Sequence, residues 1–141
     1  MTYLADVNVW LALAYVAHVH HATAQVWFRT AAEDRVLFCR ITQMGLQRLL
    51  TNPRVMGEDV LTADGAWSAF DTLMQDDRIG YAAEPQGLDD QWRQQTRGQH
   101  SGPNFWTDAY LAAFAAATGW TIVSFDRQFA RRKNVPVRLL G

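Results

Sequence analysis

The sequence alternates along its length between short apolar runs and longer segments with helical spacing. The runs have the length and composition of buried strands, and they occupy residues 3–5, 36–39, 79–82, 121–123 and 135–140. The helical segments cover residues 8–17, 22–32, 42–50, 63–74, 88–97 and 105–117. This alternation predicts an α/β fold with a central parallel sheet flanked by helices on both faces. Such sheets bind ligands beyond the carboxyl ends of their strands, so residues that directly follow a strand are the first functional candidates.

The size and composition of the chain indicate one domain. It has 141 residues, of which 49% are hydrophobic, and this supplies one continuous core. We therefore expect a single domain over residues 1–141. The longest apolar stretches are too short or too interrupted by His and Asn to span a bilayer, and no basic region precedes the first apolar run as it would in an export signal. The single cysteine, Cys39, lies in an apolar run and is expected to be a buried thiol. These features predict a cytoplasmic protein with no membrane segment.

Three aspartates occupy comparable places relative to the predicted strands. Asp6 directly follows the first strand, and Asp126 follows the fourth. Asp108 lies near the start of the helix that immediately precedes that fourth strand. We expect all three at the ligand-binding edge of the sheet, where their mutual repulsion would favour a bound cation. Ligands that are all oxygen atoms select Mg²⁺ or Mn²⁺ over zinc.

Each acid taken alone also has a purely structural interpretation. Asp6 could cap the first helix, Asp108 could lie favourably against a helix dipole, and Asp126 could shape a turn. For a single acid the structural interpretation is the better one. Three acids at equivalent positions of one predicted sheet favour a shared metal site with a catalytic role.

Four segments of the chain resemble a known family. They are Leu-Ala-Asp-Val-Asn-Val at 4–9, Leu-Gln-Arg-Leu-Leu-Thr-Asn-Pro at 46–53, Thr-Asp-Ala-Tyr-Leu-Ala-Ala-Phe-Ala at 107–115 and Ser-Phe-Asp-Arg-Gln-Phe at 124–129. In order and spacing they resemble the PIN-domain ribonuclease toxins of the VapC family. The resemblance implies a PIN fold, Mg²⁺- or Mn²⁺-dependent cleavage of RNA, a homodimer and inhibition by a cognate antitoxin in a type II toxin-antitoxin pair. It also implies that Asp6, Asp108 and Asp126 are three members of the family's acidic quartet.

The fourth acidic position departs from the family pattern. Where the family commonly has Glu, this chain has Gln43 in Ile-Thr-Gln-Met-Gly at 41–45. An amide oxygen can approach a cation, but it has no charge and its NH₂ group disfavours the contact. We therefore expect weak metal binding until RNA supplies phosphate oxygens. The alternative function is a catalytically weakened PIN-fold protein that retains antitoxin binding.

Further candidates lie close to the three acids in the sequence. Asn8, Ser124 and Thr107 could contribute polar atoms to the site. Ser124 or Thr107 could position a water or a phosphate oxygen, but capping or strand packing explains these two residues equally well.

The basic residues of the chain gather at its end. The net charge of the chain is −1, which argues against nucleic-acid binding through a generally basic surface, but the last fifteen residues carry five basic residues and no acid. Arg127, Arg131 and Arg132 of this tail could guide the RNA backbone towards the metal site or form a solvated helix face.

One tryptophan is a candidate contact for RNA. Trp106, close to Asp108, could stack on an RNA base, with core packing as its alternative. The surroundings of four other tryptophans are core-like, namely those of Trp10, Trp27, Trp67 and Trp120.

A response-regulator-like phosphoacceptor is a rival function, because it would also gather acids around Mg²⁺ at strand ends. It would need a second acid after the first strand and a suitably placed lysine, and the single lysine, Lys133, is poorly placed.

Overall fold

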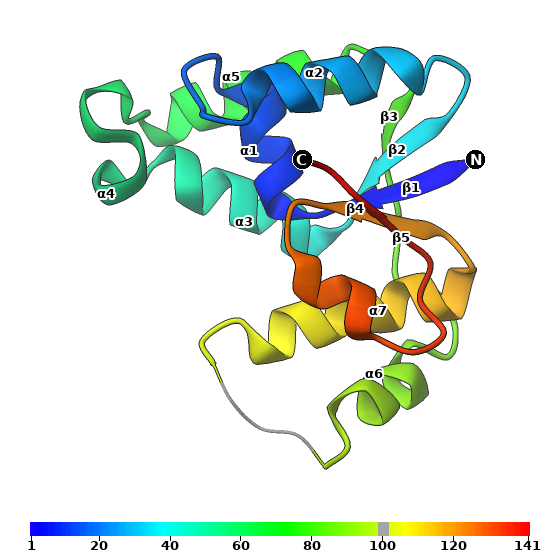
Figure 1. Cartoon of the computed structure of the whole chain (residues 1–141). Coiled ribbons are helices and arrows are strands. Elements are labelled where there is room, and N and C mark those ends of the chain that lie inside the picture. Colours follow the sequence, from blue (N-terminus) through cyan, green and yellow to red (C-terminus); the bar gives the residue numbers. More distant parts are fainter. Residues whose placement is uncertain (99–101) are drawn as a thin grey trace.

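A parallel sheet forms the centre of the molecule. The computed structural model describes residues 1–98 and 102–141. Within them five strands pair in parallel in the order β3-β2-β1-β4-β5 (Figure 1). Their bounds are β1 (Thr2–Ala5), β2 (Arg35–Phe38), β3 (Ile79–Tyr81), β4 (Thr121–Ser124) and β5 (Val137–Leu139). The parallel sheet predicted from the alternation of elements is confirmed.

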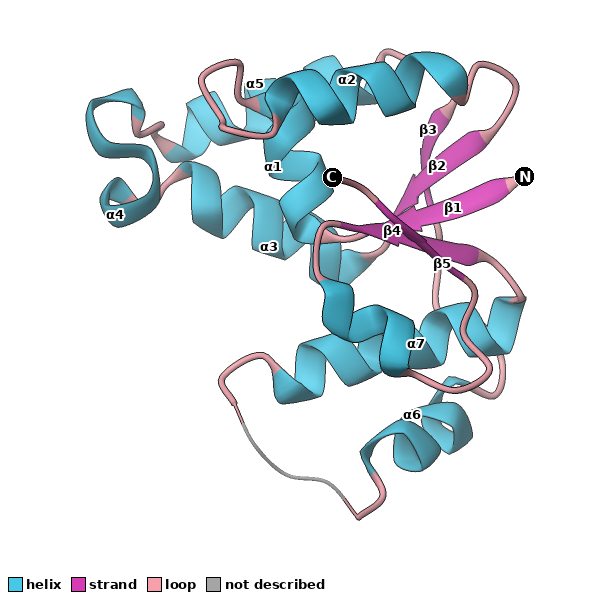
Figure 2. Ribbon diagram, in the orientation of Figure 1, coloured by secondary structure: helices cyan, strands magenta, loops and turns pink. Residues whose placement is uncertain are grey.

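Helices cover both faces of this sheet, as predicted. On one face lie α1 (Val7–Ala14), α2 (His21–Thr30), α3 (Arg40–Leu50) and α5 (Ala63–Met74), and on the other lie α6 (Leu88–Thr96) and α7 (Phe105–Thr118), as Figure 2 shows. Three short elements join them, namely α4 (Pro53–Met56), η1 (Gly57–Asp59) and η2 (Arg127–Arg131). The sequence does not predict these three elements, because each is too short to show a hydrophobic period.

The side chains of the strands divide between two cores. In β1, Tyr3 and Ala5 pack on the side of α1 and α3, whereas Leu4 packs on the side of α7. Alternation of this kind follows from the two-residue period of a strand. Trp10 of α1 stacks on Phe38 of β2 with ring centroids 3.6 Å apart, which fixes α1 against the sheet. The helix that follows Asp6 is thereby held in a defined direction.

The order of the strands defines where a ligand would bind. After β1 the chain adds β2 and then β3 on one side of β1 within the sheet, and it later adds β4 and β5 on the other side of β1. The direction of winding therefore reverses between β1 and β4. In open parallel sheets the crevice beyond the carboxyl ends of the strands at such a point is the usual ligand site.

Most expectations about individual buried residues hold. Cys39, Trp10 and Trp27 are buried, as predicted. Trp67 was predicted to lie in the core and this is wrong, because its side chain on α5 is 52% exposed while the preceding residue, Ala66, faces the sheet. None of the helices in the described ranges combines the length and the apolar character that a membrane crossing requires.

Candidate functional site

The structure brings the three predicted aspartates to the point where the sheet reverses. Asp6 directly follows β1 and is the N-cap of α1, while Asp126 lies two residues after β4 and is the N-cap of η2. Asp108 is in the first turn of α7. The charges of Asp6 and Asp126 both act on Asp108, so the three carboxylates share one electrostatic environment. The capping role predicted for Asp6 is confirmed, and Asp126, for which a turn was predicted, caps the short helix η2; both roles coexist with the shared environment.

Asp6 is the most firmly held of the three acids. Its Oδ1 accepts a hydrogen bond from the backbone N–H of Val7 at 2.8 Å, and its Oδ2 accepts one from the Ser124 hydroxyl at 2.7 Å. Burial raises the pKa of Asp6 above its ordinary value, the two hydrogen bonds lower it, and the charge of Asp126 raises it further. Each carboxylate oxygen has a second lone pair, so Asp6 can still accept a cation.

Ser124 links the ends of β1 and β4. Its buried hydroxyl donates to Asp6 and accepts from the backbone N–H of Asp126 at 2.9 Å and from the Asn8 side-chain amide at 3.3 Å. The Asn8 oxygen in turn accepts from the backbone N–H of Phe125 at 3.3 Å. Ser124 and Asn8, both predicted as additional candidates, thus orient two of the acids from within the protein.

Asp108 carries the clearest electrostatic signal. Its pKa is raised to about 6, first by burial and then by the charges of Asp6 and Asp126, and the nearby Arg132 offsets only part of the rise. No hydrogen bond contributes to the shift among the described residues. A carboxylate that is partly protonated near neutral pH marks a site where a cation would stabilise the ionised form.

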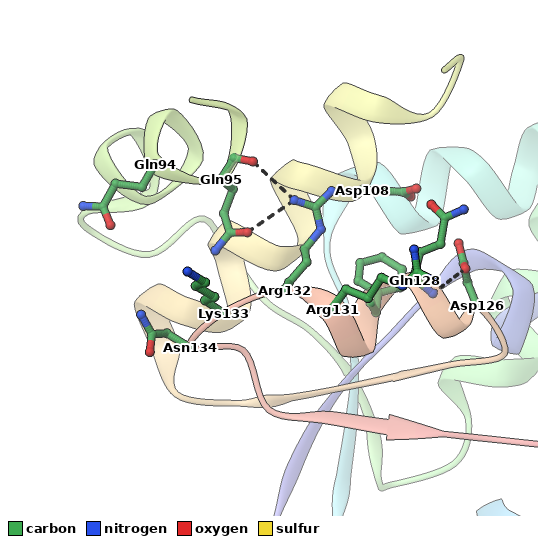
Figure 3. Close-up of a pocket in the computed structure, with 10 residues that line it drawn as sticks. Gln94, Gln95, Asp108, Asp126, Gln128, Arg131, Arg132, Lys133 and Asn134 are labelled. Carbon is green, nitrogen blue, oxygen red and sulfur yellow. Dashed lines mark hydrogen bonds between the residues drawn. The ribbon is translucent and has the colours of Figure 1, made fainter. Parts of the chain in front are cut away.

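A pocket of about 560 Å³ opens beside two of the acids. Its wall contains Gln94, Gln95, Asp108, Asp126, Gln128, Phe129, Arg131, Arg132, Lys133 and Asn134. Figure 3 shows Asp108 and Asp126 with Gln128 at one end and Gln94, Lys133 and Asn134 at the other. The pocket therefore runs from the acids to a basic and polar end, an arrangement suited to a chain of phosphates.

Arg132 is the pocket cation whose charge acts on Asp108. Its side chain is half-buried, and its Nη1 donates to the backbone oxygen and to Oε1 of Gln95, each at 3.3 Å (Figure 3). Burial lowers the pKa of Arg132, while the charges of Asp108 and Asp126 raise it. Of the three predicted arginines, Arg131 and Arg132 line the pocket and Arg127 does not.

Two predicted candidates make local contacts instead. The Thr107 hydroxyl donates to the Asn104 backbone oxygen at 3.1 Å, within its own helix turn. Gln43 is buried, and its Oε1 accepts from Arg40 Nη1 at 2.6 Å, one turn earlier in α3. The contacts of both side chains are those of ordinary helix residues.

The donor set fits a hard divalent cation. Carboxylate oxygens from Asp6, Asp108 and Asp126 are the ligands that Mg²⁺ and Mn²⁺ prefer. Among residues 1–98 and 102–141, no three acidic, His or Cys side chains lie close enough together to hold a metal ion by themselves. Mg²⁺ commonly keeps several waters and takes one or two carboxylates together with substrate phosphates. The residues present therefore suit an ion that is completed by water and by substrate.

Comparisons with known proteins identify the family of the chain. The sequence matches the family model of the PIN domain over residues 3–135. It is 45% identical to ribonuclease VapC41 of Mycobacterium tuberculosis over 98% of both chains, and 34% identical to ribonuclease VapC44 of the same organism over 92% of this chain and 89% of that protein. The chain belongs to the PIN-domain family and, within it, to the VapC ribonucleases.

Solved structures share the fold at low sequence identity. VapBC2 from Rickettsia felis, bound to a promoter DNA fragment, superposes with a TM-score of 0.74 at 16% identity over the full length of both chains. VapC20 of Mycobacterium tuberculosis, a toxin that cleaves the sarcin-ricin loop, superposes with a TM-score of 0.68 at 18% identity over 92% of this chain and 93% of that one. The expected PIN fold is thus confirmed.

Sequence reasoning missed part of the pocket. Gln94 and Gln95 come from the outer surface of α6, and nothing in their spacing distinguishes them from solvated helix residues. Gln128 and Asn134 lie in and beyond η2, a segment too short to predict. In the same stretch the sequence signal was the run of basic residues, to which Lys133 belongs.

Proposed function

We propose that this ribonuclease hydrolyses RNA phosphodiester bonds at Asp6, Asp108 and Asp126 with Mg²⁺ or Mn²⁺ as cofactor. The single observation that carries the proposal is the position of Asp6, Asp108 and Asp126 beyond β1, at the start of α7 and beyond β4, where the winding of the sheet reverses. The pKa of Asp108, which is raised first by burial and then by the charges of the other two acids, supports it. A bound cation relieves their repulsion.

The residues of the chain have distinct roles in this mechanism. Asp6, held by Ser124, and Asp126, whose carboxylate accepts from the Gln128 backbone N–H, would hold the cation beside the scissile phosphate. Mg²⁺ or Mn²⁺ bound there would supply charge neutralisation and would lower the pKa of a water, the nucleophile for phosphorus. Arg132, held by Gln95, faces the same pocket and offsets phosphate charge. Arg131 and Lys133 at the basic end hold the RNA backbone, and Arg127 adds to the long-range attraction of the tail.

We also propose the biological context. The chain acts as the toxin of a type II toxin-antitoxin pair and is inhibited by a cognate antitoxin protein. Structures of VapBC complexes from Rickettsia felis and Salmonella typhimurium, both bound to DNA, support this assignment through the shared fold. We further propose a single domain over residues 1–141, a homodimer and a cytoplasmic location. Light scattering tests the dimer: a mass near 16.0 kDa, unchanged on tenfold concentration, would contradict it.

The central experiment measures cleavage and metal binding together. Wild-type protein, Asp6→Asn and Asp126→Asn are incubated with a mixed RNA pool and Mn²⁺, with chelator as the blank. We expect Mn²⁺-dependent cleavage only by the wild type. Mn²⁺ should also raise the melting temperature of the wild type, since a ligand that binds only the folded state stabilises it. Cleavage that persists in chelator or in both variants excludes the proposed site, and a folded wild type inactive at saturating Mn²⁺ favours the weakened binding protein.

A further inference from the structure

A second pocket lies between α6 and α7, outside the site described above. Its volume is about 500 Å³, and it is lined by Asp89, Trp92, Arg93, Thr96, Arg97 and Trp106. Asp89, Trp92, Arg93 and Thr96 follow the i, i+3, i+4, i+7 spacing that places them on one face of α6. The mechanism does not use this face, and of its residues Trp92 alone is among those that pack against a core.

Two indole rings form the apolar part of the pocket. Trp106 in the first turn of α7 is 61% exposed, although burial of a tryptophan is strongly favourable. Trp92 packs edge-on against Trp106 at 5.9 Å and against Tyr110 at 5.5 Å between ring centroids, and its Nε1 donates to the Trp106 backbone oxygen at 3.2 Å. Trp92 is thus anchored to the core, and it supports a second indole that remains open to solvent.

Arginines supply the polar part of the same pocket. Arg93 and Arg97 are exposed, and neither forms an ion pair within residues 1–98 and 102–141, where the ion pairs join Met1 to Asp34 and Arg78 to Asp76. Asp89 is the only acid in the lining. Planar aromatic rings beside uncompensated guanidinium groups match a nucleotide, which offers a π-face for stacking and a phosphate for the arginines.

The pocket also adjoins the carboxylate site. Gln94 and Gln95, on another face of α6, line the pocket that contains Asp108, whereas Arg93 lines the aromatic one. Trp106 and Asp108 both belong to the first turn of α7. Because they are two residues apart, they lie on different sides of the helix, so an RNA strand whose phosphate lies at Asp108 would have to cross the N-terminal end of α7 to bring a base to Trp106.

The composition of the pocket favours RNA over a protein partner. Exposed aliphatic side chains, which an apolar protein surface would cover, lie elsewhere, at Val16, Val19 and Val26 around α2 and at Val55 and Val60 beyond α3. The pocket between α6 and α7 contains none of them. We propose that this pocket is a nucleobase subsite, in which Trp106 stacks on a base next to the cleaved phosphodiester and Arg93 and Arg97 bind the adjoining phosphates. This inference rests on the proposed ribonuclease function.

Binding to RNA that is not cleaved tests the subsite directly. In an Asp6→Asn background, the affinity for a short, labelled, mixed-sequence single-stranded RNA is measured by fluorescence anisotropy. Trp106→Ala should weaken binding roughly 5- to 150-fold, the range expected for one stacked base. Trp106→Phe should restore much of the loss, because phenylalanine keeps a π-face. Trp67→Ala is the matched control: Trp67 is 52% exposed on α5, outside both pockets, and its loss should leave the affinity unchanged.

An oligonucleotide of abasic nucleotides separates stacking from electrostatics. Trp106→Ala and its parent should bind this base-free backbone equally, since it offers nothing to stack. Arg93→Ala and Arg97→Ala should weaken binding to both oligonucleotides, and each should reduce the salt dependence by about one unit of slope. Equal losses by Trp106→Ala on the two oligonucleotides, or no loss on either, overturn the subsite.

Cleavage assays in the Asp6 wild-type background distinguish this inference from the proposed function. We expect Trp106→Ala to raise KM with little change in kcat. Cleavage by the wild type combined with an unchanged KM in Trp106→Ala rejects the subsite and leaves the function intact. Base-dependent binding through Trp106 without any Mn²⁺-dependent cleavage supports the subsite and rejects the proposed ribonuclease function. A lower mass of Trp106→Ala in light scattering, with unchanged RNA affinity, assigns the pocket to a protein contact and overturns the proposal.

Discussion

The hydroxyl of Ser124 donates a 2.7 Å hydrogen bond to Asp6, a residue 118 positions earlier in the chain. The contact joins the ends of β1 and β4 across the point where the sheet reverses direction. The Ser124 hydroxyl also accepts hydrogen bonds from the Asn8 side chain and from the Asp126 backbone N–H. One buried oxygen therefore contacts the side chain of Asp6 and the backbone of Asp126. The placement of Asp6 and Asp126 therefore depends on the same atom.

Replacing this hydroxyl should affect stability and metal binding together. Ser124→Ala leaves the amide of Asn8 and the N–H of Asp126 without their acceptor, which we expect to lower the free energy of unfolding by about 1–3 kcal/mol. Mn²⁺ affinity should fall because Asp6 loses its orienting contact. Urea unfolding and Mn²⁺ calorimetry measure the two effects. Ser68→Ala on the exposed surface of α5 is the control and should change neither, and a stable Ser124→Ala protein with normal Mn²⁺ affinity would refute the role of Ser124.

The raised pKa of Asp108 predicts how the metal-free protein responds to pH. An aspartate in an unfolded chain has a pKa of about 3.9, and that of Asp108 is raised to about 6. Below the lower value both states bind the proton. The folded state binds it more tightly, so stability is lost as pH rises towards and through 6. Asp108→Asn mimics the protonated form and avoids this loss.

Thermal melts in chelator test this sign. The gain in melting temperature of Asp108→Asn over the wild type should be larger at about pH 7.5 than at about pH 4.5. Saturating Mn²⁺ should shrink or reverse the gain at the higher pH, because the cation stabilises the ionised wild-type site. A gain that is independent of pH would mean that the pKa of Asp108 is not raised, either by burial or by the charges of Asp6 and Asp126.

The acids that follow strands were predictable for a physical reason. Parallel strands bring their carboxyl ends to one edge, so the positions of Asp6 and Asp126 after apolar runs are sufficient to bring them together. Asp108 lies on a helix, whose direction the local sequence does not fix, and its assignment to the site depended on the family resemblance as well. The contact of Arg132 with Gln95 spans 37 positions between two surface segments, and no local pattern encodes it.

Surface aromatic residues show the same limit. Trp67 follows Ala66 and Trp106 follows Phe105 in helical sequence, yet both tryptophans are more than half exposed. Hydrophobic periodicity identifies the buried face of a helix, but it does not say whether the edge of that face is covered by a neighbouring element. The pairing of Trp92 with Trp106 depends on the packing of α6 against α7, which appears only in three dimensions.

The contact of Gln43 predicts a small effect for the substitution that would complete the acidic quartet. Since Arg40 binds the Gln43 oxygen at 2.6 Å, a carboxylate in its place would form an ion pair with Arg40. We expect Gln43→Glu to leave Mn²⁺ affinity within about twofold, in contrast to the roughly tenfold or greater loss that mutating a true ligand or its support produces. Parallel Mn²⁺ titrations of Gln43→Glu, Asp126→Asn and the wild type measure this. Clearly tighter binding by Gln43→Glu would return residue 43 to the metal site.

The close approach of α1 and α3 beside Asp6 gives the last prediction. A Cβ added at Gly45 would lie 2.6 Å from Cγ2 of Val7, the residue whose backbone N–H binds Asp6. Such overpacking costs about 1–3 kcal/mol, and it outweighs the gain of up to about 1 kcal/mol from replacing glycine in a helix. Gly45→Ala should therefore be destabilising, and it should also lower Mn²⁺-dependent cleavage by displacing the start of α1.

A second substitution reverses the expected sign and serves as the control. Val7→Ala removes the methyl groups that meet the new Cβ, so within that background Gly45→Ala should no longer destabilise and should gain from helix propensity. Urea unfolding of the four proteins in this double-mutant cycle gives the coupling energy between positions 7 and 45. If Gly45→Ala destabilises equally with Val7 and with Ala at position 7, the contact between α1 and α3 is not the reason for glycine, and the link from α3 to Asp6 fails with it.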